Sequence, residues 1–145
     1  RRLMPIYARL ERAGARNVVE LHGSLWRIRC DREGKVVEHA DLPLTPRTCP
    51  CGAYWRPDIV WFEDPLDERS IAAASEALEA CDLLVSIGTS AAVFPAAHLP
   101  LIAVRHGADT LEINPETTPV SHLYRTVLRC PAASALAALW NRWKG

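Results

Sequence analysis

The sequence predicts an α/β fold in which helices cover a parallel sheet. Short apolar runs rich in β-branched residues, typical of buried strands, alternate along the chain with segments whose apolar residues recur every three to four positions. The clearest runs end abruptly in polar or turn-forming residues, as the strands of an open sheet do. With 145 residues, the chain is long enough to bury one core.

The first half of the chain contains two predicted strands and a stretch of different character. Residues 18–21 and 59–62 are apolar runs whose β-branched residues favour a pleated strand, and the first run is expected to carry His22 at its carboxyl end. Between them the apolar density falls, and three of the five cysteines lie there. We predict a small lobe at residues 29–57, with residues 1–28 and 58–145 forming the parallel-sheet part.

The second half alternates helices and strands. Asp67 stands where an N-cap would begin a helix, and the apolar residues after it share one face: Ile71, Ala74, Leu78 and Cys81. Residues 83–87 form the clearest strand, and residues 110–113 form another. A last helix is expected from Ser134 because four later residues have helical spacing: Leu136, Leu139, Trp140 and Trp143.

Charge and composition exclude several classes of partner. Lysine plus arginine equals aspartate plus glutamate at 17 each, so no net field attracts nucleic acid or an anionic membrane. The apolar runs are far shorter than the roughly 20 residues that span a bilayer. No signal pattern opens the chain and the cysteine count is odd, so a reducing, cytoplasmic compartment is expected.

Polar residues follow two predicted strands at the edge where open α/β sheets bind ligands. After residues 83–87 come Gly88, Thr89 and Ser90, whose glycine and hydroxyls suit a phosphate or sugar. After residues 110–113 come Asn114 and Glu116, whose amide and carboxylate suit the hydroxyls of a ribose. In both places an ordinary turn is the alternative.

His22 is the only titratable group between an apolar run and a glycine. Imidazole changes its protonation near neutral pH, which suits a general base, although a lone histidine is more often structural. The other histidines are expected at the surface or behind a site: His39, His98, His106 and His122.

The cysteines resemble an imperfect zinc ribbon, which has two C-x2-C pairs about 15 to 20 residues apart. Here Glu33 fills the second position of the pair begun by Cys30, and Cys49 and Cys51 are one residue too close. Three thiolates with Glu33, or with His39, could supply four ligands. The distorted spacing favours instead a lobe that keeps its shape without metal.

Six fragments occur in the order of one known family, spread between residues 11 and 140. Together they resemble the sirtuins, the NAD-dependent protein-lysine deacylases, and their shared order is highly specific. The fragments are Glu20-Leu21-His22-Gly23-Ser24-Leu25, Arg29-Cys30, Cys49-Pro50-Cys51-Gly52, Arg56-Pro57-Asp58-Ile59-Val60-Trp61-Phe62, Gly88-Thr89-Ser90 with Val93, Pro95 and Ala96, and Ile113-Asn114-Pro115-Glu116.

The resemblance implies a Rossmann-like parallel sheet, incomplete in this chain, with a zinc-ribbon-like lobe. It makes His22 the general base that accepts a proton from an NAD ribose hydroxyl after the acyl-lysine oxygen has displaced nicotinamide. It assigns the NAD phosphates and ribose to Gly88, Thr89 and Ser90, the adenosine ribose to Asn114 and Glu116, and the adenine to the backbone of Ala132. It also implies metal ligands at Cys30, Cys49 and Cys51, and peptide pairing through Ile59, Val60, Trp61 and Phe62.

Several positions depart from the family. Its Gly-Ala-Gly-x-Ser loop and central strand would precede residue 1. Pro5 and Tyr7, in Met4-Pro5-Ile6-Tyr7, replace the Asn and Asp that serve the nicotinamide pocket and cannot supply their hydrogen bonds. Glu63 replaces a glycine past which the peptide backbone runs, and Cys130 replaces another glycine.

Three functions follow from these observations. The first is an NAD-dependent deacylase that lacks turnover as this chain alone, its remaining part lying upstream or in another chain. The second is a decayed sirtuin that binds NAD, ADP-ribose or a peptide without catalysis. The third is a fragment without a function of its own, whose open sheet edge promotes association.

Overall fold

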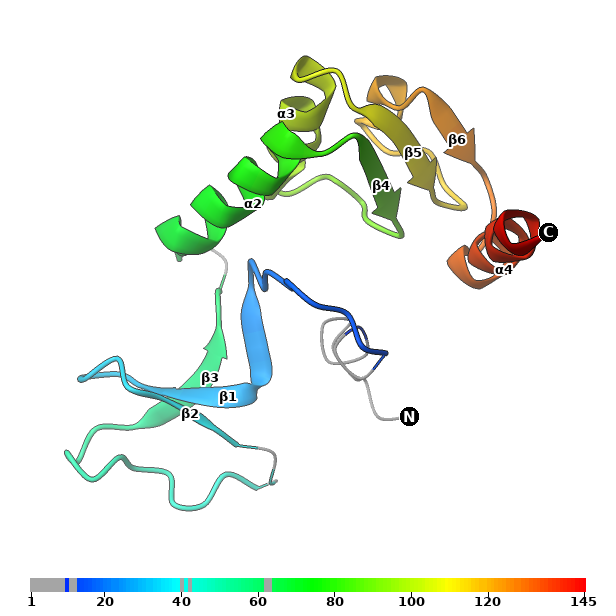
Figure 1. Ribbon diagram of the computed structural model, residues 1–145. Helices are drawn as coiled ribbons and strands as arrows, with labels where there is room; N and C mark the ends of the chain where they lie inside the picture. Colours follow the sequence, from blue (N-terminus) through cyan, green and yellow to red (C-terminus); the bar gives the residue numbers. More distant parts are fainter. Residues whose placement is uncertain (1–9, 11–12, 40, 42, 62–63) are drawn as a thin grey trace. The chain divides into compact units, whose positions relative to one another are not determined.

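The computed structural model describes residues 10, 13–39, 41, 43–61 and 64–145. The chain divides into two compact units, residues 1–71 and residues 72–145. In the described residues, the first unit contains an antiparallel three-stranded sheet and the second a parallel one (Figure 1). The predicted α/β class, a parallel sheet with helices and a small cysteine-bearing sheet, is confirmed. The predicted boundaries of the lobe at residues 29–57 stay a prediction.

The sheet of the first unit has the strand order β2-β1-β3. β1, Gly23–Cys30, is the central strand and pairs with β2, Val36–Glu38, and with β3, Trp55–Ile59. Ile28 and Cys30 of β1 are buried, and so is Cys49. The core of the unit therefore lies where the cysteines gather.

Gly23 begins β1 at a point where the backbones of β1 and β3 approach closely. Its φ is +71°, and a Cβ there would lie 2.1 Å from the carbonyl oxygen of Asp58. Only glycine combines this conformation with this approach. Nearby, the Arg27 guanidinium contacts the carboxylates of Glu20 at 2.6 Å and Asp58 at 3.0 Å, which connects the segment before β1 to β3.

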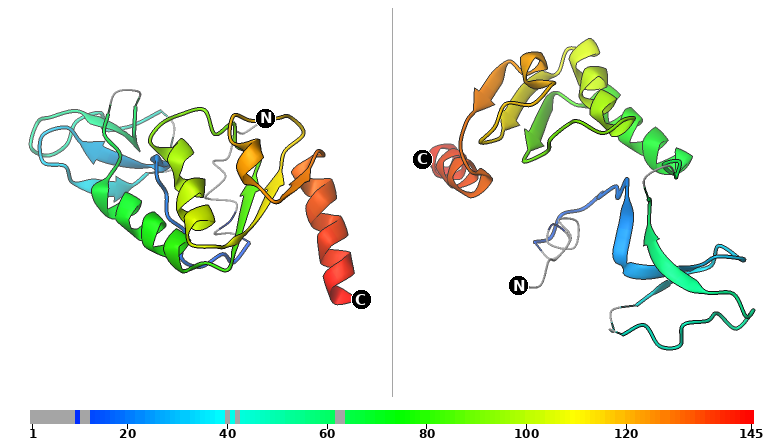
Figure 2. Two further views of the ribbon diagram at one scale, coloured as in Figure 1. Left: turned by 90° about the horizontal axis from the view of Figure 1, so that it is seen from above. Right: turned by 180° about the vertical axis from the view of Figure 1, so that it is seen from behind.

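The parallel sheet of the second unit has the order β4-β5-β6. α3 connects β4 to β5 and packs beside β4, while α4 follows β6 at the other edge of the sheet (Figures 1 and 2). Ala103 of α3 and Ile113 of β5 are fully buried. None of the helices in the described residues is long and apolar enough to cross a membrane. The elements are β4 (Leu83–Ile87), α3 (Leu99–Arg105), β5 (Asp109–Ile113), β6 (Thr126–Leu128) and α4 (Ala132–Lys144), with short 3₁₀ helices at Ala96–His98 and Ser121–Leu123.

α2, Glu68–Ala80, begins as the sequence predicts. Oδ2 of Asp67 accepts hydrogen bonds from the backbone N–H and the hydroxyl of Ser70, both at 2.8 Å, which is the geometry of an N-cap. These bonds lower the pKa of Asp67. α2 itself has no fully buried residue. The residues of the predicted buried face are only half-buried: Ile71, Ala74, Leu78 and, just after the helix, Cys81.

Two predicted strands are wrong in whole or in part. Residues 18–21 form no strand, because no strand of the described sheet lies beside them, and His22 sits in a turn before β1 rather than after a strand. The strand predicted at 59–62 ends at Ile59, because its pairing with β1 stops at the first residue of that strand. Finally, α4 begins at Ala132, two residues before the predicted start.

Candidate functional site

Four side chains that can ligate a metal converge in the first unit: Cys30, Glu33, Cys49 and Cys51. Their ligand atoms all lie within 4.8 Å of one another. Sγ of Cys30 is 3.4 Å from Sγ of Cys51, and Sγ of Cys49 is 3.7 Å from Oε2 of Glu33. Tetrahedral zinc with bonds of about 2.0 to 2.3 Å separates its ligands by roughly 3.5 to 3.8 Å. The donor set therefore fits zinc.

Two tight turns build this cluster. At the end of β1, the N–H of Gly34 donates to the carbonyl of Cys30 at 3.0 Å, and the N–H of Glu33 points at Sγ of Cys30 at 3.4 Å. In the second turn, the N–H of Gly52 donates to the carbonyl of Cys49 at 2.8 Å. The shortened Cys-x-Cys spacing does not keep the thiols from meeting, because Cys51 reaches across to Cys30 from the second turn.

The thiols of the cluster differ in acidity. The backbone N–H of Glu33 stabilises the thiolate of Cys30 and lowers its pKa in spite of burial. A backbone hydrogen bond from Cys51 acts in the same direction on Cys49, but burial and the neighbouring thiols outweigh it and raise the pKa of Cys49 to about 11. A bound divalent cation favours every thiolate in such a group.

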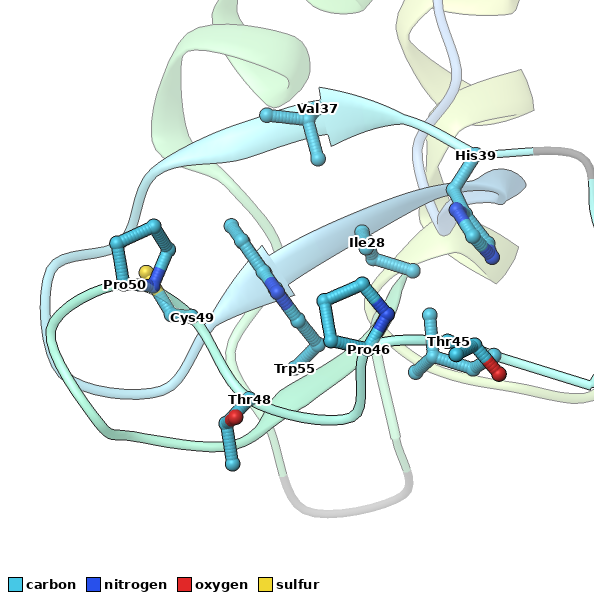
Figure 3. A pocket seen from close by; sticks show the side chains of 10 residues that line it. Ile28, Val37, His39, Thr45, Pro46, Thr48, Cys49, Pro50 and Trp55 are labelled. Carbon is cyan, nitrogen blue, oxygen red and sulfur yellow. The ribbon is translucent and has the colours of Figure 1, made fainter.

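A pocket of about 460 Å³ lies beside the metal cluster in the same unit. Figure 3 shows Trp55, Ile28 and Pro46 between Cys49 at one end and His39 at the other. Nε2 of His39 is buried and has no hydrogen-bond partner among the described residues. His39 is therefore a pocket residue and does not belong to the metal cluster, where the sequence left it as an alternative to Glu33. The full lining is Ile28, Val37, His39, Leu44, Thr45, Pro46, Thr48, Cys49, Pro50 and Trp55.

His22 is exposed in the turn before β1. Its backbone carbonyl accepts a hydrogen bond at 3.1 Å from the N–H of Val60, the first residue after β3. Of the predicted peptide-binding residues, Ile59 and Val60 are half-buried and Trp61 is 52% exposed, while Phe62 lies outside the described residues. The structure thus brings the histidine turn next to the start of the predicted peptide segment.

In the second unit, the two strand-end segments meet. Nδ2 of Asn114 donates at 2.8 Å to the carbonyl of Thr89, so the segment after β5 is fastened to the segment after β4. Oδ1 of Asn114 accepts from the N–H of Glu116 at 3.1 Å. The side chains of Thr89 and Ser90 are exposed, as is that of Glu116, and Gly88 has a φ of +61°. This edge presents hydroxyls and a carboxylate to solvent.

Two charged residues behind this edge were not singled out from the sequence. Glu112 is 1% exposed inside β5, and Arg129 contacts its Oε2 at 2.8 Å. Burial alone would raise the pKa of Glu112, but hydrogen bonds from Ser121, Thr118 and Arg129 outweigh it and lower the pKa below its usual range. A carboxylate between Leu111 and Ile113 in a predicted strand was the signal in the sequence.

Ala132 is the first residue of α4 and is half-buried. Pro131 stands before it as the N-cap residue, with no side-chain cap hydrogen bond. The residue therefore lies at a helix N-terminus, and no hydrogen bond among the described residues joins it to Asn114 or Glu116. The segments predicted at Met4, Pro5, Ile6 and Tyr7, and at Glu63, lie outside the described residues.

Comparisons with known proteins agree on one family. The model of the Sir2 family matches residues 8–95. The chain is 43% identical over 139 residues to an NAD-dependent protein deacylase of Mycobacterium tuberculosis (strain ATCC 25177 / H37Ra), covering 91% of this chain and 59% of that protein. It is 42% identical over 120 residues to NAD-dependent protein deacylase 1 of Caldanaerobacter subterraneus subsp. tengcongensis, covering 79% of this chain and 50% of that protein.

Solved structures give the same result. A crystal structure of a Sir2 homologue–NAD complex superposes with a TM-score of 0.84 at 38% identity, covering 91% of this chain and 53% of that one. A Sir2–p53 peptide–NAD+ complex superposes with a TM-score of 0.81 at 27% identity, covering 92% and 58%. The chain therefore spans between one half and three fifths of the length of these relatives. The matched family model, the identities and the conserved architecture together establish that this chain belongs to the Sir2 family.

Proposed function

We propose that this chain carries the general base and the nucleotide-binding segments of an NAD-dependent protein-lysine deacylase. The observation that carries the proposal is the joining of two strand-end segments by the Asn114–Thr89 hydrogen bond, at the edge where parallel α/β sheets bind ligands. Relatives that are 42% to 43% identical bear the name NAD-dependent protein deacylase, which supports the same reaction.

The residues at this edge fit a dinucleotide. The glycine conformation at residue 88 and the exposed hydroxyls of Thr89 and Ser90 suit phosphate and ribose oxygens. The free carboxylate of Glu116 suits the hydroxyls of the adenosine ribose, and the backbone at Ala132 is proposed to receive the adenine. When bound, NAD supplies the ADP-ribose that accepts the acyl group as nicotinamide leaves.

His22 is proposed as the general base. Its side chain is exposed, and its backbone carbonyl accepts a hydrogen bond from Val60. An exposed imidazole can accept a proton from a ribose hydroxyl. The acyl-lysine peptide is proposed to pair with the segment Ile59, Val60, Trp61 and Phe62 as an added strand. Such pairing reads the main chain, so preference for side chains around the lysine is expected to be loose.

Zinc is proposed as a structural ion held by Cys30, Cys49, Cys51 and Glu33. Three thiolates and one carboxylate would supply all four ligands of a tetrahedral ion, which is the pattern of structural and not of catalytic zinc. The site's work would be to fasten the two turns of the small sheet. Because none of the five cysteines, all of them among the described residues, forms a disulfide, a reducing cytoplasmic location is proposed.

One assay tests the function. The purified chain is incubated with NAD and an acetyl-lysine peptide, and nicotinamide release is followed beside a His22→Ala variant, while NAD binding is measured separately by calorimetry. Release that His22→Ala abolishes, with NAD binding retained in both proteins, supports the proposal. NAD binding without release is the result expected of this chain alone, and it supports the nucleotide-binding part of the proposal without separating a deacylase from a binding module. Failure to bind NAD contradicts both functions.

A further inference from the structure

The buried carboxylate of Glu112 accepts three side-chain hydrogen bonds. Oε1 accepts from the hydroxyl of Thr118 at 2.8 Å, and Oε2 accepts from the hydroxyl of Ser121 at 2.6 Å and from Arg129 at 2.8 Å. A buried ion pair is often no more stable than an apolar substitute, so its presence calls for another explanation. The explanation lies in what else the arginine contacts.

Arg129 forms hydrogen bonds with the backbone of the segment that follows β5. Its Nη1 donates to the backbone carbonyl of Glu116 at 2.8 Å and lies 3.3 Å from that of Asn114, while Nη2 donates to the hydroxyl of Ser121 at 2.9 Å. Guanidinium is planar and has five donors in fixed directions, so it can hold several acceptors at once. Glu112 holds the guanidinium in place, and the guanidinium holds the loop.

The hydrogen bonds of Arg129 also affect the exposed residues of this segment. Because the carbonyls of Asn114 and Glu116 are held, the directions in which the Glu116 side chain can extend are limited. The hydrogen bond from Asn114 to the carbonyl of Thr89 restricts the backbone at Thr89 in the same way. Binding is strengthened when the groups that receive a ligand are already oriented before it arrives. All of these residues belong to the second unit.

We propose that Arg129, held by Glu112, is a positioning residue for recognition of the adenosine-side ribose by the Asn114–Glu116 segment. The inference rests on the proposed nucleotide binding and concerns residues that orient the binding segment without contacting the ligand. Neither Arg129 nor Glu112 belongs to the motifs on which the family resemblance stands.

A matched control, Arg125, immediately precedes β6, the strand that Arg129 immediately follows. Arg125, near the start of β6, pairs with Asp109 at the start of β5, and their side chains are 76% and 62% exposed. The side chain of Arg125 has no hydrogen bond to loop backbone among the described residues. Replacing it removes one arginine and one ion pair beside the same strands while leaving the Asn114–Glu116 segment untouched.

The test compares the binding of ADP and 2′-deoxy-ADP by calorimetry, because the ratio of the two affinities reports on ribose recognition. The wild-type chain is expected to prefer ADP by roughly tenfold, the value of one hydrogen bond to a charged group. Arg129→Gln, and Arg129→Lys, which keeps the charge but not the fork, are expected to reduce the preference to about twofold. Arg125→Gln is expected to keep it.

The outcomes separate the two proposals. A variant that loses affinity for both ligands equally, or that keeps the preference for ADP, overturns the positioning role, since general loosening of the unit does not change the ratio. If both Arg129 variants fail to fold while Arg125→Gln folds, the role is structural and the inference is wrong. If the wild-type chain binds neither nucleotide, the proposed function itself fails.

Discussion

Glu33 makes the group of candidate metal ligands differ from a four-cysteine zinc site. Three thiolates and a carboxylate carry the same total charge as four thiolates, but oxygen is a harder ligand and zinc prefers the softer sulfur in structural sites. The carboxylate lies 3.7 Å from Sγ of Cys49, within reach of a shared ion. The composition of the cluster therefore predicts a zinc site that is weaker than one with four thiolates.

Zinc affinity measures this effect directly. Glu33→Cys is expected to tighten zinc binding and Glu33→Ala to weaken it, each by at least roughly tenfold, since even the loss of a group behind a ligand costs that much. Competition with a chromophoric chelator gives the affinities. His39→Ala is the control, because His39 lies outside the cluster. If His39→Ala weakens zinc binding and Glu33→Ala does not, the fourth ligand is His39 and not Glu33.

Glu112 predicts a particular response to acid. Its pKa is lowered in the folded chain, so its ionised form contributes stability that is present above the ordinary glutamate pKa of about 4.3 and is lost as the pH falls through the lowered value. Glu112→Gln is expected to unfold more easily at pH 7 by about 2 kcal/mol, the worth of hydrogen bonds to a charged group. The difference from wild type should shrink as the pH falls below 4.3.

Urea unfolding followed by circular dichroism at pH 7 and at pH 3.5 gives both free energies. Asp109→Asn changes an exposed carboxylate on the same strand and serves as the control, with little expected effect at either pH. An equal destabilisation of Glu112→Gln at both values would mean that the charge of Glu112 does not contribute.

At the scale of elements, the pairing of β1 with β3 depends on Gly23. Gly23→Ala places a Cβ 2.1 Å from the Asp58 carbonyl oxygen, so the two strands must separate. Gly34→Ala is a matched control, because Gly34 has a similar φ of +65° but nothing within 4 Å of the added Cβ. Gly34→Ala is expected to cost about 1 to 2 kcal/mol of unfolding free energy for the left-handed backbone alone, and Gly23→Ala clearly more.

Urea midpoints of the two variants, measured under the same conditions, check this difference. If both variants lose the same unfolding free energy, β1 and β3 can separate at Gly23 without a further loss. The left-handed backbone, and not the close approach of the strands, then accounts for the destabilisation. Because His22 precedes Gly23 directly, Gly23→Ala is also expected to disturb the hydrogen bond between the His22 carbonyl and Val60.

The elements predicted well from the sequence are those whose first and last residues are set by neighbouring residues in the chain. Residues 83–87 form β4 as predicted, because an apolar run is enclosed by Asp82 and Gly88, and α2 begins at its Asp67 cap. β2 and β6 have three residues each and are too short for a periodic pattern. Residues 18–21 have the composition of a strand, but no strand pairs with them in the described part of the chain, and composition alone does not reveal whether a partner is present.

The candidate sites follow the same division. Cys30, Cys49 and Cys51 could be named as candidate ligands because cysteine spacing is a local signal, and Glu33 was one of two candidates for the fourth position. Arg129 was not predictable, since its bonds to Glu112 and to the Glu116 carbonyl arise only when β6 pairs with β5. Long-range contacts of this kind depend on strand order, which a single sequence does not state.

At the scale of the whole molecule, two apolar surfaces are left uncovered in the described residues. β4 is an edge strand with one neighbour, and three of its side chains are exposed: Leu83 at 56%, Val85 at 38% and Ile87 at 39%. α4 exposes a second set, Leu136, Leu139, Trp140 and Trp143. A free strand edge beside apolar side chains pairs readily with another chain.

The chain is therefore expected to self-associate through β4 as its concentration rises. Val85→Lys puts a charge on this edge, and two such charges facing each other in a dimer should raise the dissociation constant by roughly tenfold or more. Sedimentation velocity over a range of concentrations gives the constant for each protein. Leu25→Lys is the matched control, since Leu25 is 54% exposed but lies on β1, a central strand of the other sheet. If Leu25→Lys weakens association and Val85→Lys does not, the contact lies on the first unit and β4 is not its surface.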